Sequence, residues 1–189
     1  MLYTGKGDNG TTKTFGCNQS RISKSSEVPE CLGTLDELNA FLGFCKIRAR
    51  DGIDPTITVG KKTHKTSVIL HDVQETLFII QAEVAGAPKK VRKTKVTQVE
   101  TLVNTIETAI PPVVSFSIAG GTELSAMLDV ARTLSRRSER RLVGVHELGL
   151  RKISDPSRAY ANRLSSLLFA LARLANASQG VPEENPSYR

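Results

Sequence analysis

The pattern of apolar and polar positions predicts helices along most of the chain. In five segments apolar residues recur at intervals of three and four, which places them on one face of a helix. These segments cover 33–49, 67–85, 97–109, 122–145 and 154–180. No internal repeat or strand-like alternation accompanies them. We therefore predict an all-α fold, an up-and-down bundle of five helices resembling the ferritin-like bundles, in one domain spanning 1–189.

Local signals predict where these helices begin. Thr34 is the expected N-cap of the first helix, with Glu37 three residues later in the capping-box position. Thr122 is expected to cap the fourth helix, and Ser154 or Asp155 the last. Outside the bundle (33–180) we expect an N-terminal loop over 1–26 and a flexible tail over 181–189. Polar segments at 21–29, 51–65 and 89–95 are expected to be connecting loops.

The fourth helix carries the densest charge in the chain. Its segment 130–143 reads V-A-R-T-L-S-R-R-S-E-R-R-L-V, in which Glu139 is the one acid among five arginines. Arg132, Arg136 and Arg140 share one helix face because residues four apart are neighbours. Guanidinium groups hold phosphate or carboxylate oxygens in pairs. The stripe therefore indicates either a site for an external anion or a partner's acid, or a solvated basic face.

The N-terminal segment carries a second candidate for anion binding. Gly5, Gly7 and Gly10 have G-x-G-x-x-G spacing, but only four residues precede them and no helix start follows, which excludes a Rossmann motif. Glycine-rich backbone can still close its N–H groups around an oxyanion, and Asp8 can help to hold a phosphate-bound Mg²⁺. A charge and hydroxyls are added by Thr4, Lys6, Thr11 and Thr12. The alternative is a mobile N-terminal tail rich in turn residues.

Composition narrows the class of partner. Hydrophobic residues at 39% and charged residues at 24% are ordinary for a soluble globular protein, while the formal charge of +7 indicates an acidic partner such as a nucleotide or a nucleic acid. Aromatic residues are only 5% of the chain, and the basic run K-K-V-R-K-T-K at 89–95 contains none. Since single-stranded nucleic acid is bound largely by aromatic stacking, we expect that run to be a solvated loop.

The cysteine and histidine residues indicate neither disulfides nor a metal site. Three cysteines without a C-x-x-C pair fit reduced thiols of a cytoplasmic protein, and the histidines are scattered; these residues are Cys17, Cys31, Cys45, His64, His71 and His146. No signal segment or apolar run of about 18 residues is present, so neither secretion nor a membrane span is predicted.

Four motifs, in order, resemble the PduO-type ATP:cob(I)alamin adenosyltransferases. They are Y-T-G-K-G-D-x-G-T-T at 3–12, G-T-L-D-E-L-N at 33–39, A-R-x-x-x-R-R-x-E-R at 131–140 and N-R-L-S-x-x-L-F-x-L-A-R at 162–173. The resemblance spans essentially the whole chain. It implies a homotrimer with active sites between subunits, in which cob(I)alamin attacks the 5′ carbon of ATP and releases triphosphate. ATP, Mg²⁺ and the corrinoid are the expected ligands.

The resemblance also implies roles for individual residues. ATP triphosphate would be bound by Thr4, Gly5, Lys6, Gly7, Asp8, Gly10, Thr11 and Thr12, with Lys24 close by, and the nucleotide site would be completed by Arg136, Glu139, Arg140 and Asn162. Arg132 would bridge to Asp36 of the neighbouring subunit, and Phe116 would displace the lower axial base of cobalamin. Arg132, Arg136, Glu139 and Phe116 form the expected catalytic set, with no protein-bound metal. Phe116 would otherwise be a core residue.

Two positions depart from the family pattern, and two other functions remain open. Ser166 stands where the family usually has aspartate, and Ala119 where it usually has proline before two glycines. A nucleotide- or nucleic-acid-binding module without catalysis is the main alternative, and a carrier that hands adenosylcobalamin to a downstream enzyme is another. A corrinoid reductase and an adenosylcobalamin-dependent enzyme are the expected protein partners. No nucleic-acid or membrane partner is expected.

Overall fold

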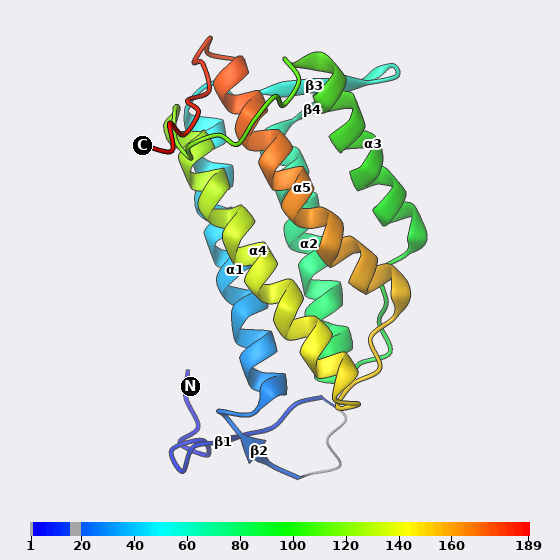
Figure 1. Cartoon of the computed structure of the whole chain (residues 1–189). Helices are drawn as coiled ribbons and strands as arrows, with labels where there is room; N and C mark the ends of the chain where they lie inside the picture. The colour runs from blue at the N-terminus through cyan, green and yellow to red at the C-terminus, as the bar shows by residue number, and fades with distance from the viewer. Residues whose placement is uncertain (1, 16–19) are drawn as a thin grey trace.

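A computed structural model describes residues 2–15 and 20–189, and Cys17 lies outside these ranges. The described residues form five helices, which run alternately up and down the bundle (Figure 1). They are α1 (Glu27–Asp51), α2 (Thr66–Ala85), α3 (Lys93–Ala109), α4 (Glu123–Glu147) and α5 (Asp155–Ala177). The predicted five-helix bundle is therefore confirmed. No helix in the described ranges is long and apolar enough to cross a membrane.

The core lies where the helices pack as neighbours, chiefly α4 on α5, α1 on α4, α1 on α2, and α3 on α5. The predicted leucine stripe of α5 is fully enclosed, as Leu164, Leu167, Leu168 and Leu171 are each at most 1% exposed. Burying such a side chain stabilises the fold by roughly 1.5–3 kcal/mol. The 3.6-residue periodicity thus identified the buried faces correctly.

The first helix begins earlier than its capping signal indicated. α1 starts at Glu27, so Pro29 lies in the first turn, where a missing backbone N–H costs little. Thr34 is buried in the middle of the helix and its hydroxyl donates to the carbonyl of Cys31 at 3.0 Å. The predicted capping box was therefore wrong, because Thr34 is bonded to the preceding turn and does not cap a helix.

The predicted loop over 51–65 contains a β-hairpin. Strand β3 (Thr56–Val59) pairs antiparallel with β4 (Lys62–Lys65), and Gly60 takes the left-handed backbone (φ +61°) that the tight turn requires. Ile57 is buried and joins the core beside α3. Alternation over only four residues was too short to distinguish this hairpin from a polar loop.

The basic run at 89–95 is also only partly a loop. Its last three residues form the first turn of α3, and Lys95 makes an ion pair with Asp72 on α2. Val91 is buried and its N–H donates to the hydroxyl of Ser157 at 3.2 Å. The prediction of a solvated loop therefore holds for the exposed Lys89 and Lys90 but not for the whole run.

Other helix starts follow their sequence signals. Thr122 is the N-cap of α4, and its hydroxyl accepts a hydrogen bond from the N–H of Ser125 at 3.2 Å, as predicted. Ser154 is the N-cap of α5, but its side chain makes no cap bond. The N–H of Ser154 instead donates to the buried carboxylate of Glu83 on α2 at 2.8 Å. This contact fixes the start of α5 against α2.

Candidate functional site

One pocket gathers the predicted nucleotide residues of α4 and α5. It has a volume of about 380 Å³ and is lined by Arg136, Glu139, Arg140, Val143, Gly144, Glu147 and Asn162. Glu139 accepts a hydrogen bond from the side-chain amide of Asn162 at 2.7 Å, and the amide oxygen of Asn162 accepts one from Arg163 at 2.5 Å. The mid-helix amide thus has partners on both sides, and its orientation is defined.

Two arginines of this pocket lack an acidic partner. Arg136 is exposed and makes no ion pair with any described residue. Arg140 donates to the carbonyl of Arg136 at 3.2 Å and also has no ion pair within the described ranges. Guanidinium groups without a carboxylate can hold the oxygens of an external anion. The pocket is therefore suited to a phosphate or carboxylate ligand.

The arginines that follow these two directly, Arg137 and Arg141, face α1 and are paired. Arg137 binds the carboxylate of Glu37, and Arg141 lies 3.7 Å from Glu27 and 3.4 Å from Glu30. All three acids are on α1, about a hundred residues earlier in the chain. Of the predicted stripe, Arg136 and Arg140 have no ion pair within the described ranges and form what we call the open face of α4, whereas Arg132 lies 3.0 Å from Asp129. Arg137 and Arg141, which were not part of that stripe, form what we call the paired face.

Sequence reasoning missed the pocket residues Val143, Gly144 and Glu147. A signal was available, because Val143 and Glu147 follow Arg136 by seven and eleven residues and so continue the same helix face. Their small or acidic side chains drew no attention beside the arginines. These lining residues thus continue the helix face of Arg136 and Arg140 toward the end of α4.

The arginine expected to bridge subunits has a partner within its own chain. The Nε of Arg132 lies 3.0 Å from Asp129 on the same helix, and its guanidinium lies 5.9 Å from the ring centroid of Phe169. Asp36 is exposed on α1 and has no hydrogen bond or ion pair among the described residues. It lines a shallow groove with Phe78 and other residues of α1 and α2. The predicted contact would join different subunits, so it stays a prediction.

The glycine-rich segment forms a compact loop at one end of the bundle. Gly5 and Gly10 both have positive φ, and β1 (Thr11–Thr12) pairs antiparallel with β2 (Ile22–Ser23). Lys24 folds back over the loop, since its amine lies 3.1 Å from the point where a Cβ on Gly7 would stand. The N–H of Lys24 also donates to the carbonyl of Gly10 at 2.9 Å. Lys24 therefore lies beside the loop, as expected.

The loop and the pocket do not meet within one chain. None of the described residues 2–15 lines the pocket of α4 and α5. The loop lies beneath the first turn of α1 in Figure 1. The residues that follow the loop contact the chain near the ends of α2 and α4. Thr14 accepts a hydrogen bond from Arg151 at 3.2 Å, and the carbonyl of Phe15 lies against Gly86. The two predicted halves of the nucleotide site are thus separate surfaces of the chain.

Phe116 lies on the connection between α3 and α4, residues 110–122, which we call the Phe116 loop. Its ring is 81% exposed, so it is not a core residue. The end of the loop is fixed to α5, because the side-chain oxygen of Asn176 accepts from the N–H of Thr122 at 2.9 Å. Gly121 has φ +92°, and a Cβ there would lie 2.5 Å from Asn176, so only glycine fits.

Side chains that could supply another chemistry are buried or dispersed. Burial raises the pKa of both Cys31 and Cys45 to about 12, which leaves them as thiols at neutral pH. No cluster of three or more His, Cys, Asp or Glu residues suited to a metal ion occurs in residues 2–15 and 20–189. The open face of α4 and the glycine loop are accordingly the main candidates for ligand binding.

Comparisons with known proteins show a likeness over most of the chain. A family model described as cobalamin adenosyltransferase matches residues 2–175. A corrinoid adenosyltransferase of Citrobacter freundii is 36% identical over 188 residues, which cover 95% of this chain and 97% of that protein. Corrinoid adenosyltransferase PduO of Salmonella typhimurium is 36% identical over 180 residues, and the matched region spans only 48% of that longer relative.

Solved structures give the same match. A variant of the PduO-type ATP:corrinoid adenosyltransferase from Lactobacillus reuteri, complexed with cobalamin and ATP, aligns with a TM-score of 0.83 at 26% identity. The alignment covers 99% of each chain. A second variant of that protein, complexed with ATP, aligns with a TM-score of 0.81. The likeness therefore extends over the whole bundle and both ends of the chain.

Proposed function

This chain belongs to the cobalamin adenosyltransferase family, and from that premise we propose that it transfers the 5′-deoxyadenosyl group of ATP to the cobalt of cob(I)alamin, releasing triphosphate. The observation that carries the proposal is the pocket on the open face of α4. There Arg136 and Arg140, which have no ion pair within 2–15 and 20–189, lie beside the hydrogen-bonded pair Glu139 and Asn162. Such a pocket is suited to the polyphosphate of a nucleotide.

The reaction makes modest demands on the protein. Cob(I)alamin is itself the nucleophile that attacks the 5′ carbon of ATP, so the chain needs neither a covalent nucleophile nor a general base. It must hold the two substrates in line and stabilise the negative charge that gathers on the leaving triphosphate. Arg136 and Arg140 can supply that charge stabilisation, while Glu139 holds Asn162 in a fixed orientation toward the nucleotide.

The glycine loop is proposed as the second half of the nucleotide site. Gly5 and Gly10 allow close approach of backbone N–H groups, Lys6 and Lys24 add positive charge, and the hydroxyls of Thr4, Thr11 and Thr12 add hydrogen bonds. The exposed carboxylate of Asp8 has no partner in the described part of the chain, which suits the oxygen donors that Mg²⁺ prefers. When bound, Mg²⁺ would neutralise charge on the triphosphate.

Assembly as a homotrimer is part of the proposal. The loop and the pocket lie on different surfaces of one chain, so a complete site needs the loop of one subunit against α4 and α5 of the next. Asp36 has no partner among the described residues and is free to meet the neighbour's arginine, for which Arg132 is the candidate. Closed rings of identical subunits commonly place shared sites at such interfaces.

The remaining roles are proposed from exposure and from family membership. Phe116 projects from its loop and would occupy the lower face of the corrinoid, displacing the axial base so that Co(II) is more easily reduced. Free, buried thiols at Cys31 and Cys45 favour a cytoplasmic location. There a corrinoid reductase would supply reduced substrate, and an adenosylcobalamin-dependent enzyme would use the product.

An anaerobic assay with ATP, Mg²⁺ and chemically reduced cobalamin tests this function. The visible spectrum should change as the Co–C bond forms, with one triphosphate released for each adenosylcobalamin produced. Omitting ATP provides the control. Binding of ATP without any transfer would contradict the proposal and favour a nucleotide-binding module.

A further inference from the structure

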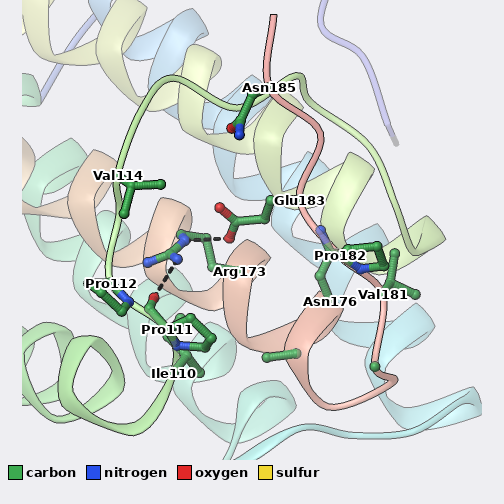
Figure 2. A pocket seen from close by; sticks show the side chains of 12 residues that line it. Ile110, Pro111, Pro112, Val114, Arg173, Asn176, Val181, Pro182, Glu183 and Asn185 are labelled. Carbon is green, nitrogen blue, oxygen red and sulfur yellow. Dashed lines mark hydrogen bonds and ion pairs between the residues drawn. The ribbon is translucent and has the colours of Figure 1, made fainter.

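The last turns of α5 hold together two segments that are distant in sequence. One is the Phe116 loop (110–122), and the other is the C-terminal tail (181–189), which passes over that loop (Figure 2). A cavity of about 460 Å³ lies between them, lined mainly by apolar side chains such as Pro111, Val114 and Pro182. The side chain that contacts both segments is Arg173, the final residue of the motif at 162–173, to which no role has yet been assigned.

Arg173 is buried and its guanidinium contacts both the tail and the Phe116 loop. It is only 7% exposed. Its Nε donates to the carboxylate of Glu183 in the tail at 2.5 Å, and its Nη2 donates to the carbonyl of Pro111 at the start of the Phe116 loop at 2.7 Å. The guanidinium also lies 6.0 Å from the ring centroid of Phe169. A planar fork with fixed donor directions can bind both segments at once, which a lysine amine cannot do with the same geometry.

A second residue of α5, Asn176, contacts the end of the Phe116 loop and the first residue of the tail. The amide of Asn176 donates to the carbonyl of Gly120 at 3.1 Å, and its backbone carbonyl accepts from the N–H of Val181 at 3.0 Å. The loop and the tail also contact each other directly, because the N–H of Ile118 donates to the carbonyl of Glu184 at 2.8 Å. This backbone contact lies two residues after Phe116. The loop is therefore held both by α5 and by the tail.

We propose that Arg173 is a positioning residue for the corrinoid step, acting through its simultaneous contacts with Glu183 and Pro111. When the tail is bound at Arg173, the Phe116 loop is held at its start, near its aromatic residue and at its end. Loss of the Glu183 contact removes one of the tail's attachments and so loosens the loop. This inference deepens the proposed function and rests on it, since the loop matters only if Phe116 meets the corrinoid.

The effect should be confined to one substrate. The Phe116 loop ends at the N-cap of α4, whereas Arg136 and Arg140 lie 14 and 18 residues further along the helix. At 1.5 Å per residue these positions are about 20–27 Å from the loop within one chain. Arg173, Glu183 and Pro111 also line none of the pocket of Arg136 and Arg140, so a change at Glu183 should alter corrinoid binding and leave ATP binding nearly unchanged.

The decisive variant is Glu183→Gln, with Glu184→Gln as its matched control. Both remove one carboxylate from the tail, but the side chain of Glu184 makes no ion pair among the described residues. For Glu183→Gln we expect KM for cobalamin to rise about tenfold, because a charge-assisted hydrogen bond becomes a weaker neutral one. KM for ATP should stay within about twofold of wild type. Glu183→Asp should recover part of the loss, and Arg173→Lys should behave like Glu183→Gln.

A spectroscopic reading separates positioning from a general loss of structure. With ATP present, the fraction of bound cob(II)alamin that is four-coordinate should fall in Glu183→Gln and remain at the wild-type level in Glu184→Gln. Equal behaviour of the two variants would overturn the inference. So would an equal rise of KM for both substrates.

Hydrogen exchange in the free protein distinguishes failure of this inference from failure of the proposed function. Amides of the Phe116 loop should exchange faster in Glu183→Gln than in Glu184→Gln, whether or not the protein catalyses transfer. A wild-type protein that makes no adenosylcobalamin would sink the proposed function. Unchanged exchange in Glu183→Gln would sink the connection through Arg173 on its own.

Discussion

The two faces of α4 carry the same residue type at adjacent positions and differ in what lies opposite. On the paired face, Arg137 and Arg141 meet Glu37, Glu27 and Glu30 of α1, and these contacts join two packed helices. On the open face, Arg136 and Arg140 look into a pocket in which they have no ion pair with a described residue. The first pair of arginines already has its anions, and the second pair can accept them from a ligand.

The difference shows that the number of charges along a helix does not reveal which of them are paired within the chain and which are available to a ligand. The run contains five arginines and one acid, which makes every arginine appear unbalanced. Helix packing supplies three acids to one face only, so the excess positive charge is concentrated on the other. Function therefore follows from which face is left without a partner. The predictions below test this distinction.

Arg136→Ala should have the largest effect. Removing a guanidinium aimed at the leaving triphosphate should lower kcat at least about 100-fold, as losses of single charge-stabilising donors do. The thermal midpoint should stay near that of wild type, because the exposed Arg136 makes no ion pair within the described ranges. Adenosylcobalamin formation and thermal melting measure the two quantities. Turnover like that of wild type would remove Arg136 from the nucleotide site.

Asp36→Ala should have the next largest effect, with Glu37→Ala as its control. Asp36 lacks a partner among the described residues, whereas Glu37 is bound by Arg137 of its own chain. We expect Asp36→Ala to weaken trimer assembly or lower activity by about tenfold, the cost of leaving one partner of an interface charge pair unmatched. Light scattering and turnover report these outcomes. An intact and fully active trimer would exclude the contact between Asp36 and Arg132.

The thiol of Cys31, which lies near the paired face, should make stability depend on alkaline pH. Burial is the main cause that raises its pKa from 9.0 to about 12, and Arg141 opposes the rise. The unfolded thiol therefore ionises above pH 9 while the folded one does not. The free energy of unfolding is therefore unaffected by this thiol below pH 9. It falls as the pH rises from about 9 to 12, by about 1 kcal/mol at pH 10. Urea titrations at pH 8 and 10 should show a smaller loss for Cys31→Ala.

Arg137→Ala should have the smallest effect and completes the comparison with Arg136. The side chains of Arg137 and Glu37 are 43% and 53% exposed, so their ion pair is largely screened by solvent. We expect a loss of about 0.5 kcal/mol in the free energy of unfolding and turnover within about twofold of wild type. Denaturant unfolding and the transfer assay measure these. A loss of activity like that of Arg136→Ala would erase the distinction between the faces.

Much of the fold could be predicted from the sequence because each helix has a continuous apolar stripe. The predicted range 67–85 differs by one residue from α2, and the N-cap at Thr122 was correct. The start of α1 was not, because Ser26 makes no side-chain cap bond and the stronger signal at Thr34 was misleading. The hairpin β3–β4 was not predicted, because its strands are too short to show a clear alternation of apolar and polar residues.

The site could be predicted only in part. The family resemblance implied that Glu139 and Asn162 share a site, and the structure brings both to one pocket. The pairing of Arg137 with Glu37 could not be foreseen, because it depends on how two helices a hundred residues apart are rotated against each other. The contact of Arg173 with Glu183 was hidden for the same reason, since the tail appeared to be merely flexible. That flexibility stays a prediction.

The most direct test of the account is a crystal structure of the protein with ATP and Mg²⁺. We expect the triphosphate to contact Arg136 on the open face of α4 in one subunit and the glycine loop, with Lys6 and Lys24, in its neighbour. Arg137 and Arg141 should keep their partners on α1. A triphosphate bound at the paired face, or bound without any contact to Arg136, would contradict the account.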